Sequence, residues 1–224
     1  KIPLGGINRV SFFGNLDLTT KDFRGRTYLL EKVFQETGKL DVYGQISPFP
    51  NLERFRFKLI QARSELSRFA YKAFKANRIE NWANKANLPN HPLSVCRKFE
   101  KKISPPCYGH EMFETLSKYS LALNYHNLHT GDYACNMRIF ETSGLACALI
   151  TDDKKDLSDY FEEGKEVLSY KTTDDLIDAV NYLTSNPKQA KEFGKNAQKR
   201  VLKDHTTEIQ IERLSGIIKT NFGA

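Results

Sequence analysis

Short apolar segments alternate with amphipathic segments over most of the chain, and this alternation limits the fold more than any other feature. Residues 9–14 combine β-branched and aromatic residues with a glycine, residues 23–37 carry apolar residues at helical spacing, and residues 39–44 again form an apolar run that ends in glycine. A strand, a helix and a second strand in this order are typical of a parallel sheet. We therefore predict an α/β fold in which helices flank a parallel sheet.

The same alternation returns after residue 104 and continues toward the end of the chain. We predict that residues 9–44 and 104–185 contribute to one parallel sheet. Pro187 follows Asn186 and gives a good start signal for a helix, because proline is favoured at the first helical position. The predicted strands are 120–124, 145–150 and 166–170, and the predicted helices are 110–119, 135–143, 156–161, 174–184, 187–202 and 206–219.

A segment of different character interrupts this alternation. Between residues 51 and 76, apolar residues recur three and four positions apart, which predicts one amphipathic helix. We predict that residues 47–103 form a helical insertion at the edge of the sheet, and that the apolar stripe of this helix is buried against the domain. The large side chains of the stripe are Leu52, Phe55, Leu59, Leu66 and Phe69.

The positive charge of the chain is concentrated in the same segment. Residues 51–102 hold 13 Lys or Arg against 4 Asp or Glu, whereas the remainder holds 21 against 23. One interpretation is an anionic partner, such as a membrane surface, a polyanionic glycan or nucleic acid. The other, which we favour, is a solvated helix that packs by its stripe. Because the aromatic residues mostly follow the stripe, we expect no nucleic-acid partner.

The stretch from Asn136 to Asp152 carries the most specific chemistry. It places a loop, a helix and then a strand in sequence, and loops at the carboxyl ends of parallel strands are where ligands bind in such sheets. Arg138 can contact a phosphate in bidentate fashion, and Glu141 can accept hydrogen bonds from two neighbouring hydroxyls of a ribose. An exposed ion pair between these two residues, three positions apart on a helix, is the alternative. The residue types leave both interpretations open.

The chain from about residue 108 to residue 214 resembles the C-terminal, donor-nucleotide-binding domain of GT-B glycosyltransferases. The resemblance is to the spore-maturation type within glycosyl transferases group 1, and its order and spacing cover about half of the chain. The matching residues are Tyr108, Gly109, Leu121 to Asn124, Asn136, Arg138, Phe140, Glu141, Leu145, Leu149 to Asp152, Tyr160, Phe161, Gly164, Glu166, Asp174 to Leu176, Arg200 to Leu202, His205 and Thr206.

This resemblance implies a Rossmann-like fold that binds a nucleotide-diphosphate sugar, and it implies roles for eight residues. The implied binding residues are Gly14, Asn15 and Arg26 on the phosphate side, Tyr108 and Gly109 near the base, Asn136 and Arg138 at the sugar and diphosphate, and Glu141 at the ribose.

One position departs from the pattern of the family. Many retaining members carry a second glutamate eight residues before the ribose-binding one, and Tyr133 stands at that position here. Asp132 is adjacent but out of register. The contact to the donor hexose and the retaining stereochemistry therefore do not carry over to this chain, and no catalytic residue is assigned.

Other chemistries have weaker support in the sequence. His110, His126 and His129 lack a third metal ligand at a sensible spacing, so we expect neither a metal nor a cofactor. Gly14 and Asn15 do not form a dinucleotide-binding motif, and no hydrolase motif is present. The four cysteines form no CxxC pair and are typical of reduced thiols in a cytosolic protein.

We predict that residues 1–224 form one nucleotide-sugar-binding domain in the cytoplasm, with membrane contact through the insertion as an open alternative. A GT-B enzyme needs two such domains, so we expect a fragment of a longer enzyme, inactive without its N-terminal domain, or a partner domain elsewhere. The expected function is sugar transfer to an unidentified acceptor in cell-surface glycan synthesis. The alternatives are a catalytically silent nucleotide-sugar-binding or scaffold domain and, from charge alone, a nucleic-acid-binding module.

Overall fold

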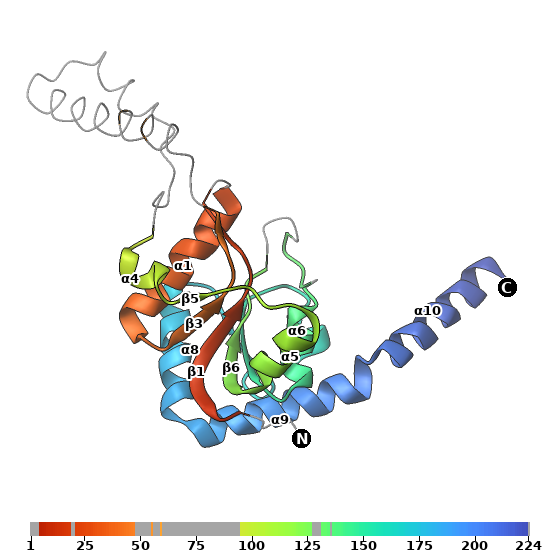
Figure 1. The fold of residues 1–224 in the computed structure, drawn as a ribbon. Helices are drawn as coiled ribbons and strands as arrows, with labels where there is room; N and C mark the ends of the chain where they lie inside the picture. Colours follow the sequence, from red (N-terminus) through yellow and green to blue (C-terminus); the bar gives the residue numbers. More distant parts are fainter. Residues whose placement is uncertain are drawn as a thin grey trace, which may run out of the picture.

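The computed structural model describes residues 5–18, 21–47, 55, 59, 95–126, 131–134 and 136–223. Within them, six strands form one parallel sheet in the order β5-β3-β1-β6-β7-β8 (Figure 1). The predicted fold class, a parallel sheet flanked by helices, is therefore confirmed. The strands are β1 (Ile7–Phe13), β3 (Leu40–Tyr43), β5 (Ile103–Ser104), β6 (Tyr119–Leu123), β7 (Ala148–Asp152) and β8 (Val167–Tyr170).

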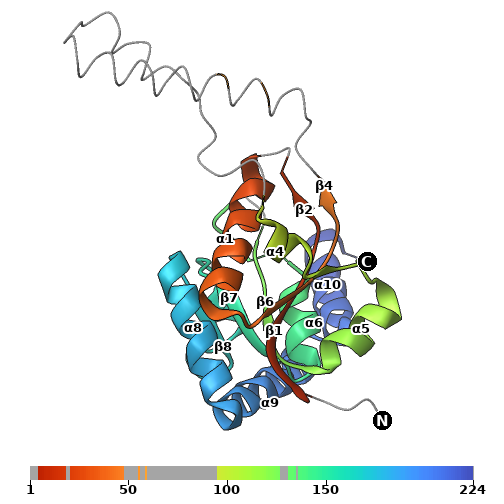
Figure 2. The ribbon, with the colours of Figure 1, turned by 60° about the vertical axis from the view of Figure 1, so that its left-hand side comes forward.

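Helices cover both faces of the sheet. α1 and α8 pack side by side on one face with α4 next to α1, whereas α5 and α6 lie on the other face (Figure 2). α9 begins in the layer of α8 and ends against α6, so it contributes buried side chains to the cores on both faces of the sheet. The helices are α1 (Lys21–Thr37), α4 (Arg97–Glu100), α5 (Gly109–Ser117), α6 (Arg138–Gly144), α7 (Leu157–Tyr160), α8 (Thr173–Ser185), α9 (Pro187–Asp204) and α10 (Thr207–Phe222).

The central strands are buried on both faces, which explains their nearly continuous apolar sequences. In β1, Val10 and Phe12 belong to the core under α1 and α8, whereas Phe13 points into the core under α5. In β7, Ile150 faces the first layer and Leu149 the second. Successive side chains of a strand point to opposite faces, so a strand covered by helices on both sides must be apolar throughout.

The strand order reverses at β1. The chain moves from β1 to β3 on one side, and later returns to place β6 on the other side of β1. Connections that leave neighbouring strands in opposite directions open a crevice outside their carboxyl ends, and such switch points are the usual ligand sites of open α/β sheets. A short second sheet of β2 (Leu16–Asp17) and β4 (Ile46–Ser47) continues beyond β1 and β3 at this end.

Local signals set the helix boundaries close to where the sequence predicts them. Pro187 is the first residue of α9, as predicted. α8 begins with a capping box, in which the Thr172 side chain accepts from the Asp175 amide and the Asp175 carboxylate accepts from the Thr172 amide. α6 starts at Arg138, three residues later than predicted.

Most of the predicted insertion, residues 47–103, lies outside the described residues. Phe55 and Leu59 are described, and they are 61% and 54% exposed. The prediction that the stripe is buried is therefore wrong at these two positions, because no described part of the domain covers them. At its other end the chain has returned to the domain by Cys96, whose amide donates to the Glu31 carboxylate of α1 at 2.7 Å, and Ile103 already pairs in β5.

α10 leaves the domain and runs away from the sheet (Figure 1). None of its residues is buried, and its apolar side chains at Ile211, Leu214, Ile218 and Phe222 are all exposed. Polar and charged residues stand between these apolar residues along α10. None of the helices in the described part of the chain is both long enough and apolar enough to span a membrane.

Two glycines inside helices give a matched test of this packing. A Cβ atom at Gly194 of α9 would overlap the carbonyl oxygen of Ala146, in the turn that leads into β7, whereas a Cβ at Gly216 of α10 would meet nothing. We expect Gly194→Ala to lower the free energy of unfolding by about 2 kcal/mol, despite the better helix propensity of alanine. Gly216→Ala should raise it or leave it unchanged in urea unfolding. A Gly194→Ala variant as stable as the parent chain would contradict this packing.

Candidate functional site

The first part of the candidate site forms where β1 ends. Arg26 of α1 is 6% exposed, its guanidinium lies 5.6 Å from the centre of the Phe12 ring, and its Nη2 donates to the carbonyl oxygen of Asn15. Gly14 is held against β3 by the bond from its amide to the Tyr43 carbonyl, 3.0 Å long. The structure thus brings together the three residues predicted for the phosphate side.

This loop depends on close backbone packing. A Cβ atom at Gly44, directly after β3, would overlap the carbonyl oxygen of Gly14. Only glycine allows two chain segments to approach so closely. The Asn15 side chain accepts from the amide of Gln45, at 3.4 Å, so the turns after β1 and β3 are joined a second time.

The second part of the site is centred on Arg138 at the start of α6. Its Nη1 lies 2.8 Å from Glu141 Oε2 and donates to Met112 Sδ of α5 at 2.6 Å. Its guanidinium also lies 5.8 Å from the centre of the Phe13 ring at the end of β1. The side chains of Arg138 and Glu141 are 22% and 23% exposed. The ion pair that the sequence left as an alternative is therefore formed, and it borders the carboxyl end of β1.

Asn136 links α6 to the sheet. Its Oδ1 accepts from the Arg138 amide at 2.9 Å, and its Nδ2 donates to Asn124 Oδ1 at 2.8 Å. Asn124 directly follows β6 and is buried. Asn136 is therefore fixed between the carboxyl end of β6 and the first residue of α6.

Beyond Asn124 lies a buried polar cluster to which the sequence prediction gave no role. Asp152 Oδ1, at the end of β7, accepts from the His126 amide at 2.9 Å and lies 2.7 Å from His126 Nδ1. Asn124 Nδ2 donates to Thr151 Oγ1 at 3.0 Å. The sequence signal that could have identified this cluster is the position of its polar residues, which directly follow the apolar runs of β6 and β7.

Tyr108 and Gly109 stand apart from the other predicted residues. Tyr108 precedes the first turn of α5 and is 69% exposed, and Gly109 adopts a φ of 53°, in the left-handed region that favours glycine. In the described part of the chain, no hydrogen bond or ion pair joins either residue to the other six. The neighbouring Cys107 has a raised pKa because of burial and the charge of Glu111, and Arg138 is close enough to oppose this shift.

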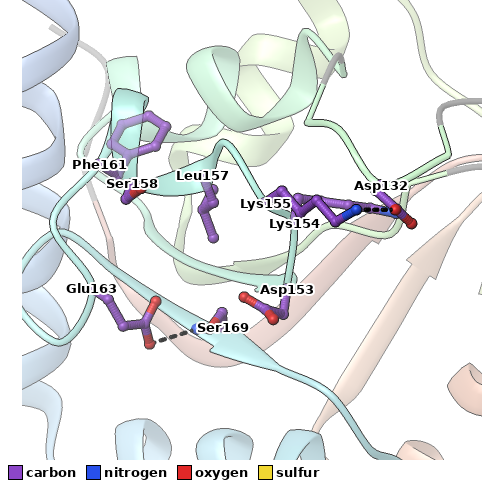
Figure 3. Close-up of a pocket in the computed structure, with 9 residues that line it drawn as sticks. All are labelled: Asp132, Asp153, Lys154, Lys155, Leu157, Ser158, Phe161, Glu163 and Ser169. Atoms are coloured by element: carbon purple, nitrogen blue, oxygen red, sulfur yellow. Dashed lines mark hydrogen bonds and ion pairs between the residues drawn. The ribbon is translucent and has the colours of Figure 1, made fainter.

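Tyr133 stands where many retaining members of the family carry a second glutamate, and the described carboxylate next to it, Asp132, is paired. Tyr133 is 59% exposed. Asp132 forms an ion pair of 2.6 Å with Lys155, which lowers the pKa of its carboxyl group (Figure 3). Both residues of that pair line a cavity of about 520 Å³ near α7 and β8, and none of the eight predicted residues lines it. Asp132 is therefore engaged away from the predicted site.

Two of the three histidines considered as metal ligands have other partners. His110 pairs with Glu114 at 3.2 Å on the exposed face of α5, and His126 pairs with Asp152. His129 lies outside the described residues. Among the residues that the structure describes, no three His, Cys, Asp or Glu side chains come together as metal ligands would.

The fold and this arrangement define a class of protein. The structure is one Rossmann-like half of a GT-B fold, in which charged side chains gather at the carboxyl ends of β1 and β6. Residues 58–216 match the family model described as glycosyl transferase-like. This match covers well over half of the chain, and the chain therefore belongs to the glycosyl transferase-like family.

Solved structures share the fold at low sequence identity. The C-terminal domain of the group 1 glycosyl transferase LpcC from Francisella tularensis has a TM-score of 0.50 and 12% identity, over 91% of this chain and 89% of that one. TarM from S. aureus, in a complex that includes UDP, has a TM-score of 0.56 and 15% identity, over 95% of this chain and 36% of that one. HepE from Anabaena, in complex with UDP and glucose, has a TM-score of 0.56 and 9% identity, over 95% and 48%.

The present chain thus spans less than half of the length of TarM and HepE, but most of the LpcC domain. The comparison with curated protein sequences found no match. At these identities the likeness to solved structures establishes the fold alone.

The Arg138–Glu141 pair can be tested as a stabilising contact in its own right. Ion pairs three positions apart on a helix contribute little, because both side chains remain partly hydrated. In a double-mutant cycle of Arg138→Ala and Glu141→Ala, we expect a coupling free energy of about 0.5 kcal/mol in urea unfolding. A coupling above about 2 kcal/mol would instead be typical of a buried structural pair, and would show that the two side chains serve the fold.

Proposed function

We propose that this chain is the donor-binding part of a glycosyltransferase and holds a nucleotide-diphosphate sugar at the switch point between β1 and β6. The observation that carries the proposal is the position of Arg138. It lies between the last residue of β1, α5 and Glu141, at the sheet edge where open α/β folds bind ligands. A guanidinium and a carboxylate side by side suit a ligand that has both a diphosphate and a ribose diol.

The proposed division of roles follows from the geometry. Arg138 has donors left after its bonds to Met112 and Glu141, and these can reach phosphate oxygens. Glu141 uses Oε2 for Arg138, and its other oxygen can accept from a ribose hydroxyl. When sugar is transferred, the diphosphate leaves with increased negative charge, which Arg138 would stabilise. The proposed binding residues remain Gly14, Asn15, Arg26, Tyr108, Gly109, Asn136, Arg138 and Glu141.

UDP is the first nucleotide to test. TarM and HepE have both been crystallised with UDP, and they share the fold of this chain. The acceptor is proposed to be a glycan or another hydroxyl-bearing molecule in cell-surface glycan synthesis, with the reaction on the cytoplasmic side. A membrane surface bound through the basic insertion is a further proposed partner, supported by the exposed Phe55 and Leu59. We propose no nucleic-acid partner.

A second candidate function is nucleotide-sugar binding without transfer. The observation that favours it is Tyr133, which replaces a glutamate that many retaining relatives place near the donor hexose. In this case the chain would bind the donor as a scaffold or sensor. Binding experiments cannot separate the two functions, whereas turnover by a complete two-domain protein can.

Binding of UDP is expected to depend on both charged residues of α6. Arg138→Ala and Glu141→Ala should each weaken UDP binding by about 1.5–3 kcal/mol, the contribution of a hydrogen bond to a charged group. Isothermal titration calorimetry measures this directly. Glu114→Ala is the matched control, because Glu114 is an acidic residue on an exposed helix face and, among the described residues, forms its ion pair with His110. Equal UDP affinity in all three variants would place the site elsewhere.

The 224-residue chain alone is expected to bind the donor without transferring sugar to an acceptor. One Rossmann-like half offers a single wall of the cleft, so it cannot hold donor and acceptor together and exclude water from them. The measurement is a product assay with UDP-sugars and a panel of glycan acceptors, using a protein that also contains a second Rossmann-like half as the positive control. Transfer by the isolated chain would contradict this expectation.

A further inference from the structure

The polar groups around Asn124 form one chain of hydrogen bonds with a single direction. The Arg138 amide can only donate, so the atom of Asn136 that it contacts at 2.9 Å is the carbonyl oxygen. The Asn136 amide nitrogen then faces Asn124 and donates to its Oδ1 at 2.8 Å. This in turn directs the Asn124 amide nitrogen to Thr151 Oγ1, 3.0 Å away. One backbone amide thus fixes the orientation of two side-chain amides.

The chain of bonds ends at the Asp152 carboxylate, which can only accept. The Thr151 hydroxyl lies 3.5 Å from Asp152 Oδ1, and His126 approaches the same oxygen with its backbone amide at 2.9 Å and with Nδ1 at 2.7 Å. A contact of 2.7 Å between Nδ1 and a carboxylate requires the proton on Nδ1. The Thr151 hydroxyl and both nitrogens of His126 that contact Asp152 therefore donate to it, although Asn124 Nδ2 also lies 3.3 Å from His126 Nδ1. The other oxygen of Asp152 lies 3.4 Å from Lys154 Nζ.

The cluster is shielded from water, which makes its geometry strict. Asn124 and His126 are 2% exposed and Thr151 is fully buried, whereas the Asp152 side chain retains 17% exposure. A buried polar group that loses its partner cannot turn to solvent, so a fully connected network holds its members in one arrangement. Nε2 of His126 has no partner among the described residues, so the ring is oriented through Nδ1, which lies 2.7 Å from Asp152 Oδ1 and 3.3 Å from Asn124 Nδ2.

We propose that Asp152 and His126 are positioning residues of the donor site: through Thr151 and Asn124 they fix Asn136, and Asn136 fixes the first residue of α6, Arg138. The inference rests on the proposed function, because it assigns the purpose of the network to the diphosphate side of that site. Neither Asp152 nor His126 needs to touch the ligand. Their effect passes from the end of β7, across the end of β6, to α6.

The first experiment uses the ligand-free chain, so its outcome does not depend on any nucleotide. Nitrogen-15 NMR at pH 8 is expected to show the proton of His126 on Nδ1. In Asp152→Asn the hydrogen exchange of the Arg138 amide should accelerate at least about tenfold, while amides in the middle of α8 and α9 keep their protection. Asp153→Asn is the matched control, because this neighbouring carboxylate is 43% exposed and contacts Lys171 instead.

The second experiment separates positioning from general stability by comparing UDP with uridine. The network orients the residues assigned to the diphosphate, so Asp152→Asn should weaken UDP binding about tenfold and change uridine binding less than twofold. His126→Phe, which fills the ring volume without Nδ1, should have the same selective effect. Thermal melting of each variant shows whether it is folded, and Asp152→Asn, which keeps an acceptor oxygen, serves where His126→Phe is unstable.

Three results would overturn the inference: a bare Nδ1 on His126, unchanged exchange of the Arg138 amide in folded Asp152→Asn, or an equal loss of UDP and uridine affinity. If the parent chain binds neither UDP nor uridine, the proposed function fails. The NMR experiment then still decides whether Asp152 controls the start of α6. The failure of the positioning role and the failure of the donor site are therefore distinguishable.

Discussion

β1 pairs with β3 on one side and with β6 on the other, both in parallel, and the candidate site depends on this pairing. After Gly14 the chain leaves this sheet, and β2 pairs with β4 instead. The connection to β3 carries α1 to one face, whereas α5, which precedes β6, lies on the other. The loops at the ends of β1 and β6 therefore diverge. Gly44 lets the turn after β3 pack directly against Gly14, because it has no Cβ atom to overlap the Gly14 carbonyl oxygen.

Local signals predict five of the six strands of this sheet, whereas β5 at its edge is not predicted because its two residues fall at the end of the expected insertion. Strands such as β6 and β7 are short apolar runs bounded by polar residues, and the helices between them carry apolar residues at helical spacing. Both kinds of element can therefore be recognised from the local sequence. The strand order cannot be recognised in this way, because the position of β6 beside β1 depends on contacts between residues more than 100 positions apart. The same limit explains the error at Phe55 and Leu59. Periodicity predicts that a helix has an apolar face, but it does not say what covers that face.

The site shows a similar division. Arg138 and Glu141 can be found from the sequence because their types and spacing suit a phosphate and a diol, and because the order of residues around them resembles a known family. The contacts of Arg138 with Phe13 and Met112 are long-range, and no pattern encodes them. The ion pair and the ligand contacts are also compatible, since a guanidinium has five donors and a carboxylate has two oxygens. The observed ion pair therefore does not exclude the proposed ligand contacts of the same two residues.

Tyr133 bears on the sugar part of the proposed donor and not on its nucleotide part. A glutamate at that position would offer two acceptor oxygens to hydroxyls of the hexose, whereas a tyrosine offers one hydroxyl and an aromatic surface. The adjacent carboxylate, Asp132, pairs with Lys155 and lines a cavity that none of the proposed binding residues lines. The residues proposed for the ribose and diphosphate do not include position 133: they lie directly after β1, in α1, and in or just before α6. In the proposed donor complex, the hexose must therefore be contacted by groups other than a carboxylate at position 133.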